Sequence, residues 1–72
     1  MVSYKPLWKL LIDRNMSKAD LRKQTGIAPN TFTRMRKGEE VSMAVLNKIC
    51  STLGVSYGDI IEYIPVEEKT EE

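Results

Sequence analysis

The 72-residue chain contains no histidine and a single cysteine, Cys50. Without histidine the serines lack their usual general base, and one thiol makes neither an internal disulfide nor a zinc cluster. The four glycines form no phosphate-cradling loop, and Glu39 and Glu40 are neighbours in a predicted loop rather than an opposed acid and base. We therefore expect no enzyme, no metal site and no cofactor.

Long apolar runs are also missing. The longest, Met43 to Leu46, has four residues, whereas a membrane helix needs about twenty. The first residues lack the apolar stretch and cleavage site of a signal peptide, so we expect a cytoplasmic protein and no membrane partner. A chain of this length forms one small domain that buries only about 60% of its unfolded surface, which favours dimerisation.

Charge of each sign is concentrated in one half of the chain. Residues 1–37 contain nine lysines and arginines against two aspartates, a net charge of +7. Residues 38–72 contain two lysines against eight acidic residues, a net charge of −6. A cationic surface backed by an acidic one suggests a polyanionic partner, because phosphate neutralisation is the main sequence-independent term in nucleic-acid binding. The alternative is an ordinary solvated surface whose charges happen to cluster.

Periodicity and capping signals predict helices from the start of the chain. A first helix is expected over residues 4–14, capped by Ser3 and ended at Asn15, which tolerates the left-handed conformation. Ser17 and Asp20 resemble a capping box that opens a second helix. The second helix is expected to end at Gly26.

Three further helices complete the predicted domain. Pro29 suits the first position of a third helix, over about residues 29–37, because its fixed φ is already helical. A fourth helix is expected from Ser42 to Gly54, and a short fifth helix before Pro65. No alternating strand pattern of useful length is present. The sequence thus predicts an all-α, compact five-helix domain over residues 1–65 and an acidic, disordered tail over residues 66–72.

The stretch from Ser17 to Gly38 has the pattern of a helix-turn-helix: a capped helix, a turn with glycine, and a second short helix. Apolar residues of this stretch predict a wedge that locks the two helices against the core. They are Leu21, Ile27, Phe32 and Met35. With 100° per residue, the polar residues of the third helix fall on the opposite side. They are Asn30, Thr33, Arg34 and Lys37.

This polar face matches the chemistry of base edges in the major groove, which admits one helix. Arg34 is suited to donate two bonds to guanine O6 and N7, and Asn30 to pair with adenine N6 and N7, each pair discriminating by about 1 to 3 kcal/mol. Thr33 is suited to meet a thymine methyl. The alternative for Arg34 and Asn30 is a merely solvated polar role.

Other residues are predicted to contact the DNA backbone. Thr31 lies to the side of the third helix, and Lys18 starts the second helix, whose exposed N–H groups favour phosphate. Lys37 suits either a base or a phosphate. For Arg36, nearer the buried side, a structural salt bridge and a phosphate contact are both open.

Along residues 4–64 the sequence resembles the lambda-repressor-like, Cro-type (Xre family) helix-turn-helix regulators of phages and bacteria. The matching segments are Met16-Ser17-Lys18-Ala19-Asp20-Leu21, Thr25-Gly26-Ile27, Asn30-Thr31-Phe32-Thr33-Arg34-Met35-Arg36-Lys37-Gly38 and Leu46-Asn47-Lys48-Ile49-Cys50-Ser51-Thr52-Leu53-Gly54-Val55. The resemblance implies a five-helix DNA-binding domain whose third helix reads bases. Carried over by position, it implies base contacts from four residues and backbone contacts from two. These are Pro29, Asn30, Thr33 and Arg34 for bases, and Lys18 and Thr31 for the backbone.

Three residues depart from the family pattern. Arg22 stands where alanine is preferred, Ala28 replaces the usual capping serine or threonine, and Pro29 replaces a common polar base reader. We expect Arg22 to lie beside the DNA backbone or to pair with Asp20 or Glu39.

The predicted function is a sequence-specific, double-stranded DNA-binding transcription regulator, a repressor that occupies its operator. The alternative is a protein-interaction module of the same fold, an antirepressor-like or antitoxin-like adaptor. Apolar residues spread over about 160° of the predicted fifth helix, more than the roughly 100° stripe that one core needs. This excess predicts a symmetric homodimer. The interface residues are Tyr57, Ile61, Tyr63 and Ile64.

Overall fold

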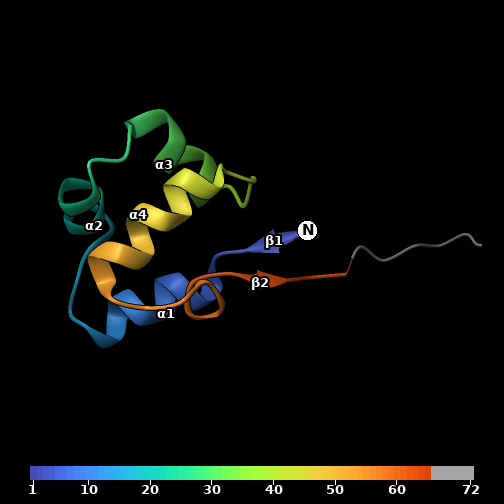
Figure 1. Cartoon of the computed structure of the whole chain (residues 1–72), viewed down its shortest axis with the longest axis horizontal. Helices are drawn as coiled ribbons and strands as arrows, with labels where there is room; N and C mark the ends of the chain where they lie inside the picture. The colour runs from blue at the N-terminus through green and yellow to red at the C-terminus, as the bar shows by residue number, and fades with distance from the viewer. Residues whose placement is uncertain (66–72) are drawn as a thin grey trace, which may run out of the picture.

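Four α-helices share one core within the described part of the chain, residues 1–65, and a short sheet joins the ends of this part (Figure 1). In the computed structural model the elements follow in the order β1 (Val2–Ser3), α1 (Lys5–Asp13), α2 (Lys18–Thr25), α3 (Pro29–Arg36), α4 (Met43–Leu53), the 3₁₀ turn η1 (Tyr57–Asp59) and β2 (Glu62–Tyr63). The predicted acidic tail, residues 66–72, lies outside the described residues. None of the helices in residues 1–65 has the length and apolar character needed to cross a membrane.

The predicted capping residues start α2 and α4. The Asp20 backbone N–H donates to Ser17 Oγ at 3.0 Å, and the Ser17 backbone N–H donates to Asp20 Oδ2 at 3.1 Å, so the capping box is confirmed. Ser42 Oγ accepts from the Val45 backbone N–H at 3.3 Å. Each cap satisfies an N–H group that has no partner within its helix.

Two long helices end beside each other. Asn15 has a φ of 56°, as expected for the residue that reverses the chain after α1. The adjacent Arg14 side chain donates from Nη1 to the Leu53 carbonyl at the end of α4, at 2.7 Å. This carbonyl is one of those that a helix end leaves unpaired, and a cation is favoured there. Arg14 therefore connects the C-terminal ends of α1 and α4.

Every helix contributes to the core, and each buries the stripe that its periodicity predicts. The buried apolar side chains are Tyr4, Leu7, Leu11, Leu21, Ile27, Phe32, Met35, Leu46, Ile49, Leu53 and Ile60. In Figure 1, α4 runs diagonally from beside α3 down to α1, and α2 lies to its left. The packing of α2 and α3 around α4 determines which side of α3 faces outward.

The predicted start of the first helix is wrong by one residue. Helix α1 runs from Lys5 to Asp13, Tyr4 occupies the cap position without a side-chain cap, and Ser3 lies in β1. Ser3 Oγ does accept from the Lys5 backbone N–H, at 3.2 Å, so its hydroxyl contacts the helix from the preceding strand.

The predicted fifth helix is also wrong. Asp59 Oδ2 accepts from the Ser56 backbone N–H at 3.0 Å, as in a helix cap, but only the three-residue turn η1 follows. The chain then extends, and β2 pairs antiparallel with β1 in the register Val2 to Tyr63 and Ser3 to Glu62. Gly58 and the β-branched Ile60 and Ile61 are poor helix formers, so pairing with the N-terminal strand outweighs continuation of the turn. The fold is therefore mostly helical with a small sheet, rather than all-α with five helices.

The capping box of α2 makes stability depend on pH. The backbone N–H and then the side chain of Ser17 lower the pKa of Asp20, so the ionised carboxylate stabilises the fold above its unfolded-state pKa. We expect Asp20→Asn to lower the melting temperature at neutral pH. The difference from wild type should disappear as the pH falls through the folded-state pKa of Asp20. Thermal unfolding followed by circular dichroism over a pH series measures this.

The double variant with Ser17→Ala provides the control for that measurement. Because Ser17→Ala removes the hydroxyl partner, the pH-dependent part of the Asp20→Asn effect should shrink in this background. An effect of unchanged size would contradict a contribution from the Ser17 hydroxyl, since the backbone N–H of residue 17 is kept.

Candidate nucleic-acid interface

A tight turn between α2 and α3 sets the angle at which α3 leaves the core. Gly26 ends α2 with a φ of 73°, a left-handed conformation that a residue with a Cβ adopts only at a cost of about 1 to 2 kcal/mol. Thr25 Oγ1 donates to the Leu21 carbonyl at 2.8 Å and accepts from the Ile27 N–H at 3.4 Å. Ile27 is buried, so the turn is held on its inner side by an apolar contact and on its outer side by hydrogen bonds.

Helix α3 buries one side and exposes the other, as its pattern predicts. Phe32 and Met35 are 5% and 1% exposed. All four residues predicted to contact bases lie on its exposed part, at positions where no core residue covers them. They are Pro29, Asn30, Thr33 and Arg34. Pro29 occupies the first helical position as predicted, and Ala28 before it supplies no side-chain cap.

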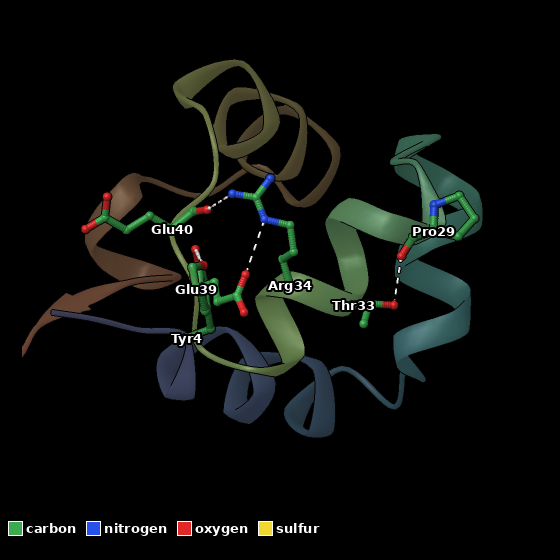
Figure 2. Close-up of polar contacts among 6 residues, drawn as sticks. All are labelled: Tyr4, Pro29, Thr33, Arg34, Glu39 and Glu40. Atoms are coloured by element: carbon green, nitrogen blue, oxygen red, sulfur yellow. Dashed lines mark hydrogen bonds and ion pairs between the residues drawn. The ribbon is translucent and has the colours of Figure 1, made fainter.

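Thr33 turns its hydroxyl back to its own helix. Its Oγ1 donates to the Pro29 carbonyl at 3.0 Å (Figure 2). With the hydroxyl occupied in this way, the methyl group is the part of the side chain left for an apolar contact.

Arg34 turns toward the loop that follows α3 (Figure 2). Its Nε lies 3.4 Å from Glu39 Oε1, and its Nη2 donates to the Glu40 carbonyl at 3.0 Å. The Arg34 and Glu39 side chains remain 56% and 53% exposed, so the pair is open to solvent and to a ligand. Glu39 therefore pairs with Arg34. The sequence had offered Glu39 as one of two possible partners of Arg22.

Tyr4 anchors the same loop from below. Its hydroxyl donates to the Glu39 carbonyl at 2.7 Å, although its ring is buried in the core. Burial raises the pKa of the Tyr4 phenol, and the Glu40 carboxylate adds to the rise. The Val41 backbone, through a hydrogen bond, and the charge of Arg34 act in the opposite direction and lower this pKa. Tyr4, the cap residue of α1, thus fixes the loop beside the exposed face of α3.

An aromatic cluster positions Lys18, one of the residues predicted to contact the DNA backbone. Lys18 Nζ lies 4.5 Å from the centroid of the Trp8 ring, a cation–π geometry worth about 0.5 to 1 kcal/mol at an exposed site. The Trp8 ring meets Phe32 edge-on, with centroids 6.0 Å apart. The ammonium group at the start of α2 is therefore positioned by the residue that supports α3.

The other predicted backbone contacts border the exposed face to different degrees. Lys37 is exposed at the C-terminal cap of α3, and Thr31 and Arg22 are half-buried. Arg36 is exposed and lines a hollow of about 230 Å³ with Lys5 and Lys37. These side chains make the surface around α3 cationic, except where Glu39 and Glu40 follow the helix.

Sequence reasoning missed the functions of Tyr4, Glu39 and Glu40 around Arg34. The Tyr4 hydroxyl reaches the Glu39 carbonyl 35 residues along the chain, and the contacts of the two glutamates with Arg34 cross a loop rather than a helix turn. No periodic spacing signals such contacts.

A capped helix, a glycine turn and a second helix with a buried apolar side and an exposed polar side define a helix-turn-helix DNA-binding domain. A family model described as a Cro/C1-type HTH DNA-binding domain matches residues 6–66. The chain belongs to this family. The resemblance noted from the sequence is thereby confirmed.

A solved structure supports the same assignment. The crystal structure of the transcriptional regulator VanUg, form II, is similar to this chain with a TM-score of 0.88 and 51% sequence identity. The match covers 90% of this chain and 87% of that one. A comparison with curated proteins gives no match.

Tyr4→Phe tests the anchor of the loop. Loss of one hydrogen bond is expected to lower the free energy of unfolding by about 0.5 to 1.5 kcal/mol. Because the folded state raises the pKa of this phenol, the unfolded chain ionises first, and stability falls as the pH rises through the unfolded-state pKa toward the folded one. Denaturant unfolding at neutral and alkaline pH should show that Tyr4→Phe reduces this alkaline loss. The wild-type protein under the same conditions is the control. An unchanged alkaline loss in Tyr4→Phe would contradict the prediction.

Proposed function

We propose that this protein is a sequence-specific regulator that binds double-stranded DNA and reads the major groove with α3. The observation that carries the proposal is the opposition of buried Phe32 and Met35 to an exposed polar face on the same helix. A major groove about 12 Å wide admits one helix, and the eight residues of α3 span roughly 12 Å at 1.5 Å per residue. Hydrogen-bonding side chains on such a helix meet base edges directly.

The individual contacts follow from the chemistry of the exposed side chains. Arg34 is proposed to donate to guanine, Asn30 to pair with adenine, and Thr33 to present its methyl to thymine. Pro29, at the start of the helix, is proposed to make apolar contact with a base edge. Phosphate contacts are proposed to fix the register, and they carry no base information themselves. They come from Lys18, Thr31, Lys37 and Arg22.

We further propose that the regulator is a cytoplasmic repressor. Occupation of an operator excludes polymerase without any chemical step, and the proposed mechanism needs only binding. The similarity to a protein described as a transcriptional regulator is consistent with this assignment.

A second copy of the chain is the proposed partner at the β1–β2 end. Tyr57, Tyr63 and Ile64 are 41%, 76% and 36% exposed, and Ile61 is half-buried. Tyr57, Ile61 and Tyr63 line an open hollow of about 490 Å³ together with Met1. A symmetric dimer through this surface would present two copies of α3, which in related dimers read half-sites about 34 Å apart.

Selection from a randomised DNA duplex tests the direct readout. We expect the wild-type protein to recover a consensus, and Arg34→Ala to relax a guanine within it, at a cost of about 1 to 3 kcal/mol on the consensus site. Lys18→Ala should weaken binding to all sequences and reduce the salt slope by about one. Lys48→Ala, at an exposed position of α4, provides a control lysine outside the proposed contacts. Recovery of unrelated sequences would instead indicate the protein-interaction module.

Sedimentation equilibrium tests the dimer. Tyr63→Glu should convert a dimer to a monomer, because the carboxylate would be desolvated in the interface. Ile12→Glu is a matched control, since Ile12 on α1 is 73% exposed but lies outside the proposed surface. A wild-type protein that stays monomeric at high micromolar concentration, and binds DNA as one copy, would contradict the proposal.

A further inference from the structure

Arg34 uses only one edge of its guanidinium group within the protein. A guanidinium has five N–H donors, one on Nε and two on each terminal nitrogen. Nε lies 3.4 Å from Glu39 Oε1 in an ion pair, and one Nη2 donor is taken by the Glu40 carbonyl. The second Nη2 donor and both Nη1 donors are not needed for these two contacts. A pair of nearly parallel N–H groups, one on each terminal nitrogen, therefore remains for an outside acceptor.

Glu39, whose carboxylate lies beside Arg34 Nε, is itself fixed by hydrogen bonds to both of its backbone polar groups. The Glu39 backbone N–H donates to the Arg34 carbonyl at 2.9 Å, and the Glu39 carbonyl accepts from the Tyr4 hydroxyl at 2.7 Å. Between these residues the chain turns at Gly38, with a φ of 82°. Figure 2 shows the Glu39 and Glu40 segment lying along the arginine side chain. The backbone of Glu39 is thus fixed relative to α3, and its carboxylate is carried with it.

We propose that Glu39 is a positioning residue for base recognition, which holds the Arg34 guanidinium so that its terminal N–H pair reads guanine. This inference rests on the proposed reading of DNA by α3. Guanine presents two neighbouring acceptors, O6 and N7, in the major groove, and they match a pair of parallel donors. The ion pair and the guanine contact use different donors, so Arg34 can make both at once.

Orientation, rather than charge attraction, is the contribution of Glu39. An exposed ion pair stabilises a fold only weakly. However, a freely rotating arginine side chain loses conformational entropy about several bonds when it is immobilised at an interface. An arginine already held in one orientation loses less. The carboxylate opposes the nearby phosphates, which lowers affinity for every sequence alike. Glu39 is therefore expected to lower general affinity and to increase discrimination at one base pair.

Glu39→Ala and Glu40→Ala separate these two effects. Both substitutions remove one exposed carboxylate from the same loop, and both keep the Glu40 carbonyl that accepts from Arg34. Only Glu39→Ala removes the partner of Nε. Binding is measured on the selected duplex and on duplexes that replace the guanine read by Arg34, over a range of salt concentrations, with melting curves to confirm that each variant is folded.

We expect both variants to bind all sequences more tightly at low salt. Glu39→Ala alone should lose discrimination at the guanine position, by about two- to twelvefold. Glu39→Gln, which keeps an oxygen acceptor without the charge, should retain part of it. In an Arg34→Ala background, Glu39→Ala should change base preference at no position.

Equal discrimination by Glu39→Ala and Glu40→Ala would overturn the proposal. An increase in guanine discrimination on Glu39→Ala would also overturn it, because Glu39 would then compete with the base for Arg34. If Arg34→Ala leaves every base preference intact, the proposed readout by Arg34 fails first, and the positioning role fails with it.

Discussion

The orientation of α3 depends on the burial of two side chains on its inner surface. Phe32 and Met35 are almost completely excluded from solvent, and removal of such a side chain from a core costs about 2 to 5 kcal/mol. Any rotation of the helix about its axis would expose one of them. The polar residues of the outer face are therefore directed outward by a contact in which they take no part.

Phe32 also contributes to the position of Lys18 at the start of α2, through the ring of Trp8. Trp8 meets Phe32 edge-on, and the ammonium group of Lys18 lies over the Trp8 ring. Aromatic packing between α1 and α3 thus helps to position a cation at the start of α2. In a domain this small, a single cluster stabilises the core and orders the surface around it.

Charge around α3 is less uniform than the division of the chain suggests. The N-terminal half supplies the cations, but the loop after α3 returns two glutamates of the C-terminal half to the same face. One of them pairs with Arg34, the arginine proposed to contact guanine. In the proposed reading of DNA, the cationic surface would provide affinity for phosphate and the held arginine would provide selectivity for a base.

Local sequence patterns predicted α1 to α4, the caps of α2 and α4, and which side of α3 is apolar. The Ser17 capping box, the left-handed Asn15, the first-turn Pro29 and the buried pair on α3 each depend on residues within one or two turns, so periodicity and capping rules predict them. Only the tertiary structure decided the rest. In place of the predicted fifth helix, residues 62–63 form a strand that pairs with β1. Local patterns did not predict this strand, because its partner lies at the other end of the described chain. The contacts of Arg34 with Glu39 and Glu40, and the anchor from Tyr4, are formed across a loop and between distant segments. Their free energy exists only once the helices have packed and brought these groups together.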